Sequence, residues 1–277
     1  MTGEAAAVTG HLRREQAPIT AAAWQAVDDE ARRTLRHFLA GRPLVDVDGP
    51  HGWRHAAVDV GRAEPLASAP GVGVEGRVRR VQPVVELRTA FRLRRAELDA
   101  AERGADDPNL QPLIDAARRA AEAEDRVVFL GYRDGGITGI AEASPYPALP
   151  ITDDYGEYPR LAARAAAELR RAGVGGPYGI ALGPRCYTGV VETTEHGGYP
   201  VLQHLRTILG GPVIWAPAVD GAVVVSLRGG DYRFSAGQDF AVGYAGHDDD
   251  AVDLYLEESF TFRVVDERAA VVLHHAS

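Results

Sequence analysis

Three glycines have the spacing of a loop that binds a dinucleotide cofactor. They are Gly71, Gly73 and Gly76 of PGVGVEGR, which match the pattern G-x-G-x-x-G. That chemistry needs a buried strand before the loop and a helix that starts at it, so that the helix N-terminus meets a pyrophosphate. The flanks oppose both requirements, because Pro65 and Pro70 precede the loop, and Pro83 with several β-branched residues follows it. We therefore expect a connecting loop, and an α/β oxidoreductase that uses these glycines is the least favoured function.

Other polar groups could bind a cation or move a proton, but each of them lacks some of the residues that this chemistry needs. Asp46 and Asp48 begin like a calcium loop and lack its third ligand and closing glutamate. The run HDDD at 247–250 is more typical of a solvated turn, and His51 and His55 lack further ligands. No G-x-S-x-G motif, triad or carboxylate pair is visible. We predict no catalytic residue, no metal site and no cofactor.

The stretch ETTEHGGYP, residues 192–200, places two carboxylates and one imidazole between two predicted helices. It is an ordinary polar loop, or it rings an opening if copies of the chain meet around a symmetry axis. The residues alone do not choose between these interpretations.

Composition limits the class of protein. The chain has 277 residues, a formal net charge of −9, and 30 basic residues that are all arginine. The charge does not favour nucleic acid or an anionic membrane as partner, and chemistry at a lysine amine is excluded. Cys186 is the only cysteine, which excludes an internal disulfide and a cysteine zinc site, and we expect it to be a small buried residue. With no long apolar run and no signal peptide at the start, we expect a cytoplasmic protein.

The elements that would position these residues follow from periodicity. Residues 1–16 are expected to be a mobile tail, and a helix is expected from the N-cap Thr20 to Gly41. A second helix starts at Asp107–Pro108 or nearer Gln111, and residues 145–220 mix short strands and helices in one α/β subdomain.

Two segments alternate apolar and polar residues as strands do. Residues 85–93 end a stretch, 48–94, that is rich in glycine and proline and poor in core formers. We expect this stretch to find its apolar partners on another chain. The second alternating strand covers residues 252–264.

Taken in order, several blocks resemble the shell proteins of family 1 encapsulins, the bacterial nanocompartments. The blocks are PITAAAWQAVDDEARRTL, GRPLVDVDGPHGW, ELDAAERG, AEDRVVFLGY, GPYGIAL and the long run from WAPAVDG to EESFTF. The similarity extends from about residue 16 to the C-terminus. It implies an α+β chain with the fold of tailed-phage major capsid proteins of the Hong Kong 97 type.

By position, the resemblance divides the chain into five parts. These are an N-terminal tail with a helix of the peripheral domain (1–47), an extended arm or E-loop (48–94), the peripheral domain with its spine helix (95–136), the axial domain (137–222) and the C-terminal part of the peripheral domain (223–277). The glycine-rich loop then lies in an arm that contacts a neighbouring subunit.

The resemblance also implies a function without catalysis. Encapsulin shells are icosahedral, the smallest with about sixty copies. They enclose a dye-decolorising peroxidase or a ferritin-like protein, which docks through a C-terminal targeting peptide. The expected cargo-binding residues are Arg32, Leu35, Leu39, Phe240, Val242 and Tyr244. The expected residues of a pore for small solutes are Glu192, Thr193, Thr194, Glu195, His196, Gly197, Gly198 and Tyr199.

Departures from the family pattern limit what is carried over. EHGGYP has one glycine more than expected, and Ala96 stands where some members place an aromatic residue near a flavin, so no flavin is predicted. Without lysine the shell lacks the isopeptide crosslink of the phage relative. A phage or prophage major capsid protein is the alternative, and the charge of −9 weakens it because packaged DNA favours a neutral or basic lining.

Overall fold

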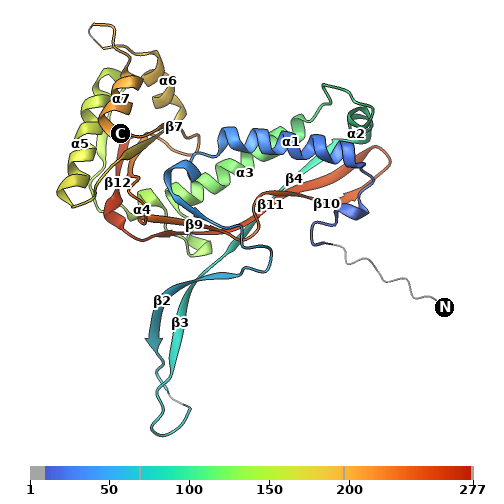
Figure 1. The fold of residues 1–277 in the computed structure, drawn as a ribbon, viewed down its shortest axis with the longest axis horizontal. Coiled ribbons are helices and arrows are strands. Elements are labelled where there is room, and N and C mark those ends of the chain that lie inside the picture. Colours follow the sequence, from blue (N-terminus) through green and yellow to red (C-terminus); the bar gives the residue numbers. More distant parts are fainter. Residues whose placement is uncertain (1–9, 69, 196, 276–277) are drawn as a thin grey trace. The chain divides into compact units, whose positions relative to one another are not determined.

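The described residues form helices, two mixed β-sheets and a two-stranded ribbon (Figure 1). The computed structural model describes residues 10–68, 70–195 and 197–275. It divides into two compact units that alternate along the sequence. The first contains residues up to 38, 86–121 and 238–259, and the second contains 39–85, 122–237 and the residues from 260 onward.

The first unit opens with helix α1, Ala21–Phe38. The Thr20 hydroxyl accepts a hydrogen bond from the Ala23 N–H, 3.4 Å long, which confirms the predicted N-cap. Val27, Ala31 and Leu35 are buried on one face, as the apolar spacing predicts. The predicted end at Gly41 is wrong by three residues, because the chain after Phe38 turns into a short 3-10 helix, Arg42–Leu44.

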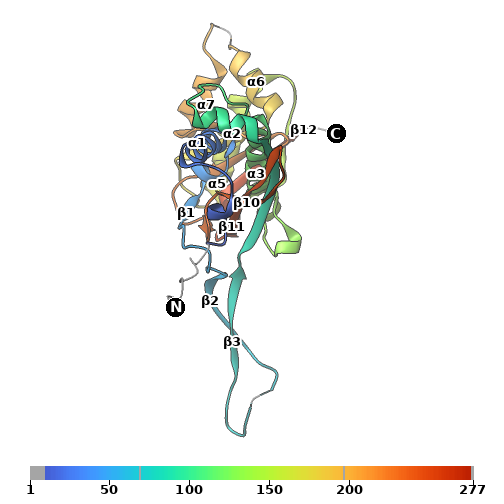
Figure 2. The same ribbon diagram turned by 90° about the vertical axis from the view of Figure 1, so that its right-hand side faces the viewer.

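The first unit also contains paired strands and further helices. Strand β10, Ala241–His247, pairs antiparallel with β11, Ala251–Val264, and β4, Val85–Arg94, pairs with β11. Helix α2, Arg95–Glu102, contacts α1, and the two lie side by side in Figures 1 and 2. Helix α3, Gln111–Leu130, begins after Asn109, whose side chain accepts from the Gln111 N–H, so the later of the two predicted starts is confirmed.

Strand β4 corrects one expectation. The alternation that predicts a strand is confirmed. However, the apolar side chains of β4 are covered by their own chain and not by another one. Phe91 is 7% exposed and Leu93 is 1% exposed, because β4 adds to β11 of its own chain. Apolar residues at every second position predict a half-buried strand, but they do not show which chain covers its apolar face.

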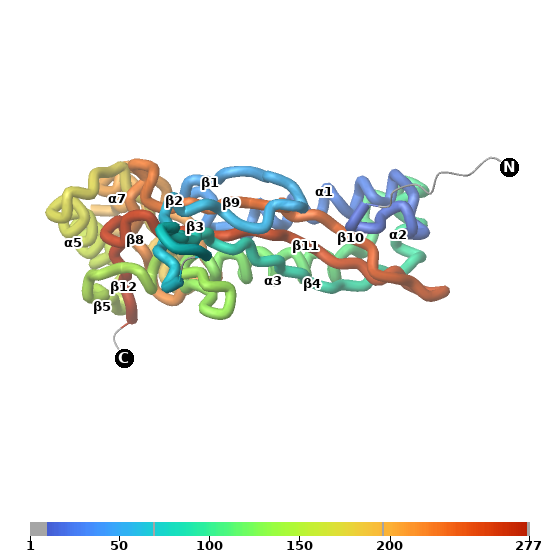
Figure 3. The backbone as a smooth tube through the Cα atoms, turned by 90° about the horizontal axis from the view of Figure 1, so that it is seen from below, coloured from blue at the N-terminus to red at the C-terminus, as the bar shows by residue number. Residues whose placement is uncertain are grey.

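The second unit is built on a sheet in the order β5-β12-β8-β6-β7, with the helices beside it (Figure 3). Its strands are β5 (Leu149–Ile151), β6 (Tyr178–Leu182), β7 (Val213–Trp215), β8 (Ala222–Ser226) and β12 (Ala270–His275). Its helices are α4 (Ile140–Ala143), α5 (Tyr158–Arg171), α6 (Pro184–Glu192) and α7 (Val201–Leu209). Helix α5 packs on β8 and β12, and α7 packs on α5 and β6. The fully buried strands β6 and β8 confirm the predicted α/β core.

Two further strand pairs belong to the second unit. β1, Asp46–Asp48, pairs parallel with β9, Tyr232–Ala236, and β9 pairs antiparallel with residues 260–264 of β11. The ribbon consists of β2, Ala57–Pro65, and β3, Arg77–Pro83, which pair with each other alone and are largely exposed (Figure 2). The loop with Gly71, Gly73 and Gly76 joins them, and a strand rather than a helix follows it. The geometry of a dinucleotide-binding turn is therefore absent.

Two buried acidic residues of α3 hold the start of the second unit. Asp125 accepts hydrogen bonds of 2.8–3.1 Å from the backbone N–H groups of Ala40 and Gly41. Glu124, fully buried, forms a bidentate pair with Arg42 at 2.6–3.0 Å. Burial raises the pKa of Asp125 to about 7, although the two backbone donors oppose the rise.

Candidate functional site

The predicted pore residues form a short hairpin between α6 and α7. The Glu195 N–H donates to the Tyr199 carbonyl across 2.8 Å, and Thr194 bridges Pro200. Gly197 and Gly198 have φ of 104° and 82°, which only glycine adopts freely, so both glycines of EHGG are needed for the turn. His196 lies outside the described residues. The hairpin leaves Glu192, Thr194 and Tyr199 exposed, whereas Thr193 and Glu195 are half-buried.

Glu195 is held by a residue that is not among those predicted from the sequence. Its Oε1 atom lies 2.7 Å from Nδ1 of His204, in the first turns of α7. The His204 ring meets the Tyr199 ring edge to face, with centroids 5.9 Å apart. The only sequence signal is a histidine nine positions after an acidic loop residue, which is too weak to predict a contact.

The predicted cargo residues do not form one open surface. Leu35 is 7% exposed, and Val242 and Tyr244 on β10 are also buried, so these three belong to the core of the first unit. Arg32 is exposed and forms an ion pair of 2.7 Å with Asp29, while Phe240 is half-buried. Leu39, also half-buried, belongs to the second unit. The cargo surface remains a prediction.

The segment before α1 contacts β10, which corrects the expectation of a mobile tail for residues 10–16. The Tyr244 N–H donates to the Leu12 carbonyl across 2.9 Å. Arg14 forms an ion pair of 2.8 Å with Asp28 and stacks on Trp24, 3.9 Å from the ring centroid. These contacts fix the entry into α1. The composition of the segment does not predict these contacts, because the partner residues lie far away in the sequence.

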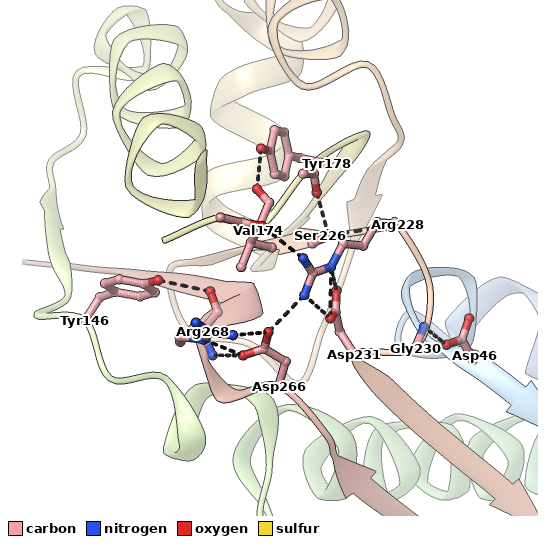
Figure 4. A network of polar contacts seen from close by, with 12 residues as sticks. Asp46, Tyr146, Val174, Tyr178, Ser226, Arg228, Gly230, Asp231, Asp266 and Arg268 are labelled. Carbon is pink, nitrogen blue, oxygen red and sulfur yellow. Dashed lines mark hydrogen bonds and ion pairs between the residues drawn. The ribbon is translucent and has the colours of Figure 1, made fainter. Parts of the chain in front are cut away.

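A polar network joins four loops of the second unit (Figure 4). Arg228 donates to both carboxylate oxygens of Asp231 at 2.7–3.1 Å and to Asp266 at 2.9 Å. Arg268 donates to Asp266 from the other side, and its hydrogen bonds hold the pKa of Asp266 below its usual value. Tyr146 donates to the Arg268 carbonyl across 3.1 Å. Every charge in this network has a partner, so the network supports structure rather than catalysis.

The remaining candidates lack the geometry of a reactive site. Among the residues that the structure describes, no three histidine, cysteine or carboxylate side chains are grouped to hold a metal ion. Asp248 of HDDD accepts hydrogen bonds from Arg92 and from the backbone of Asp250 and Ala251, as a turn does. The Tyr158 hydroxyl donates to Sγ of Cys186 across 3.2 Å, and burial raises the pKa of this thiol. A thiol that keeps its proton is a poor nucleophile.

The described parts of the chain include no helix that is long and apolar enough to cross a membrane.

Comparison with solved structures defines the class. A virus-like particle from Pyrococcus furiosus matches with a TM-score of 0.63 at 19% identity, over 91% of this chain and 99% of that chain. The capsid of an empty GTA particle matches with a TM-score of 0.51 at 15% identity, over 86% and 90%. The chain therefore has the capsid fold of the Hong Kong 97 type, in its mixed α+β form, as expected.

Closer relatives identify the family. The family model described as encapsulating protein for peroxidase matches residues 9–261. The chain is 50% identical to a type 1 encapsulin shell protein of Rhodospirillum rubrum, over 96% of this chain and 97% of the relative. It is 45% identical to one of Mycobacterium tuberculosis, over 96% and 99%. The chain belongs to the type 1 encapsulin shell proteins. It is a structural shell protein, and this membership rejects the oxidoreductase and phage capsid alternatives.

Proposed function

We propose that the chain assembles with copies of itself into a closed icosahedral shell of about sixty subunits that encloses a peroxidase or a ferritin-like protein. In a member of a shell family, the single observation that carries the proposal is an arm that its own chain does not cover. Val78 is 47% exposed and Val81 is 52% exposed on the ribbon, and Leu66 lies open near its loop. Exposed β-branched residues on a two-stranded ribbon need a neighbouring surface.

The parts of the chain then take the roles of a capsid subunit. Residues 48–94 form the arm in this proposal, although within it β4 belongs to the body of its own chain. Residues 137–222 form the axial domain around the symmetry axes, and the remainder forms the peripheral domain, with its N-terminal helix in 1–47, its spine helix in 95–136 and its C-terminal part in 223–277.

The hairpin of residues 193–200 lines the five-fold pore in this arrangement. The exposed groups Thr194 and Tyr199, together with Glu192 at the end of α6, suit the passage of small polar solutes and ions. Because Glu195 is tied to His204, its charge contributes to the shape of the hairpin more than to the lining.

Assembly is tested by electron microscopy and size-exclusion chromatography of the purified chain. Hollow particles of megadalton size are expected. Val81→Asp places a charge on the arm and should abolish particles while leaving the circular dichroism of the chain intact. Val265→Asp, at a residue that is also 52% exposed but lies after β11, is the matched control. A monomeric wild-type chain, or equal assembly by both variants, would contradict the proposal.

A further inference from the structure

A histidine near the start of α7 has two ring nitrogens with different surroundings. Nδ1 of His204 lies 2.7 Å from a carboxylate oxygen of Glu195. Its Nε2 atom contacts no polar group of the residues that the structure describes, and the side chain is 37% exposed. The Tyr199 ring meets the imidazole at an interplanar angle of 71°. The imidazole is therefore held at one nitrogen and open at the other.

The carboxylate determines which of the two nitrogens carries the proton. An ionised carboxylate only accepts hydrogen bonds, so Nδ1 of the neutral ring is the N–H donor to Glu195. The lone pair of the ring is then on Nε2. Histidines that bind metal ions usually donate their second nitrogen to a carboxylate or carbonyl, which fixes the tautomer and makes the ring a stronger ligand. His204 therefore has the orientation of a metal ligand with its binding position open.

A second histidine of the second unit is paired with a carboxylate in the opposite way. His51 is 38% exposed, and its Nε2 atom, rather than Nδ1, lies 2.9 Å from Asp48. Its ring lies against the ring of His55, with centroids 4.7 Å apart. The more accessible nitrogen of His51 is thus already used within the chain. Equal exposure and a different nitrogen in the ion pair make His51 a matched control for His204.

One chain supplies too few ligands to hold a metal ion at this place. Within the described parts of the chain, no three histidine, cysteine or carboxylate side chains are grouped for that purpose. Glu192, the last residue of α6, is exposed and offers a carboxylate. Helices α6 and α7 pack on each other, and the hairpin joins them (Figure 1). Copies arranged around a symmetry axis would repeat His204 and Glu192 around one opening.

We propose that Nε2 of His204 binds a first-row divalent transition-metal ion where the hairpins of several copies meet, with Glu192 of a neighbouring copy as the second ligand. This placement rests on the proposed function, which puts the hairpin at the five-fold pore. An imidazole nitrogen with carboxylate and water oxygens suits Zn²⁺ or Co²⁺, whereas Ca²⁺ and Mg²⁺ prefer oxygen ligands alone. Glu195 is a positioning residue, because it orients the ring and does not touch the ion.

The test titrates assembled particles with Co²⁺, whose visible absorption changes when an imidazole nitrogen replaces water. His204→Gln keeps an amide donor towards Glu195 but has no imidazole, and His51→Gln is the control. Wild-type and His51→Gln particles should bind Co²⁺ with the same affinity, and His204→Gln particles should bind it at least about tenfold more weakly. Equal affinity of the two variants, or no binding by wild-type particles, would overturn the site.

Two carboxylate variants separate the positioning residue from the second ligand. Glu195→Gln can still accept from Nδ1 but lacks the charge, so it should weaken Co²⁺ binding by about tenfold without removing the absorption change. Glu192→Gln should alter the absorption spectrum itself, and an unchanged spectrum and affinity would exclude Glu192 as a ligand. If His204→Gln does not assemble, Glu195→Gln must show the loss of affinity in its place.

Electron microscopy of each preparation distinguishes this site from the proposed function. Wild-type particles that form and do not bind Co²⁺ would refute the metal site and leave the shell intact as a conclusion. A chain that forms no particles would refute the shell, and the metal site with it, because the second ligand comes from another copy. Dissociated wild-type chains should bind Co²⁺ at least about tenfold more weakly than particles, and equal affinity would show that copies contribute no ligand.

Discussion

The buried carboxylate of Asp125 makes the stability of the chain depend on pH in an unusual direction. Its pKa in the folded chain is about 7, compared with 3.8 for an exposed aspartate, because burial disfavours the ionised form. The folded chain therefore binds this proton more tightly than the unfolded chain does. Stability from this group is greatest below about pH 4, falls as the pH rises towards 7, and is constant above that.

The magnitude follows from the difference between the two pKa values. Each pKa unit corresponds to about 1.4 kcal/mol, so ionised Asp125 makes folding less favourable by about 4 kcal/mol above pH 7. The amide of Asp125→Asn does not ionise in this pH range, so the stability of this variant does not decline in the same way. The amide retains one acceptor oxygen for the N–H groups of Ala40 and Gly41, so the variant should be about 1 kcal/mol less stable near pH 4.

The assay is the melting temperature of assembled particles between pH 4 and 8. For domains of this size, 1 kcal/mol corresponds to about 2–4 °C. The wild-type melting temperature should therefore fall by on the order of 10 °C more than that of Asp125→Asn over this range. Asp115→Asn, on the same helix at a side chain that accepts a hydrogen bond from the exposed Gln111, changes the charge equally and should keep the wild-type slope. Identical slopes for wild type and Asp125→Asn would refute the reasoning.

Four further substitutions test the structure elsewhere. Arg228→Ala leaves Asp231 buried without its partner and should lower the free energy of unfolding by about 3 kcal/mol. Arg268→Ala, at a more exposed site, should lower it by less than about 1 kcal/mol. Equal losses in thermal unfolding experiments would contradict this ranking. His204→Ala frees Glu195 and should increase protease cleavage within residues 193–200 several-fold in assembled particles, and an unchanged rate would mean that the hairpin holds itself. Gly243→Ala places a methyl group into the Tyr255 ring and should lower stability by about 2 kcal/mol, so a melting temperature equal to wild type would show that the ring has room to move.

Local patterns predict the elements of this chain well, and partners across the sequence poorly. The cap at Thr20 and the strands β4 and β11 are confirmed because local propensity and sequence pattern agree within a few residues, although β11 is buried on both faces. The end of α1 is wrong because the N–H groups of Ala40 and Gly41 are satisfied by a carboxylate 84 and 85 residues away. No window of sequence contains that information.

The candidate sites show the same contrast between local features, which are predicted, and contacts between distant residues, which are not. The resemblance to encapsulins proposes a pore lining at residues 192–199, which stays a prediction, and the two glycines of this turn are explained by their positive φ values. It does not reveal the contact of Glu195 with His204. For the cargo surface, the resemblance names Leu35, but the apolar spacing on α1 marks the same residue as core, and Leu35 is buried. A residue on the apolar face of a helix is therefore a weak choice for a binding surface.

The ribbon of β2 and β3 has a consequence for how the chain must be made in the cell. Its edges carry unpaired backbone groups beside valines, which is the kind of surface that seeds aggregation when nascent chains accumulate. The ion pairs of Arg79 with Asp59 and of Arg80 with Glu64 place charges along it, as gatekeeper residues do. If the ribbon docks on a neighbouring subunit as proposed, synthesis that outpaces this docking directs chains into inclusion bodies, and slow production at low temperature should favour intact particles.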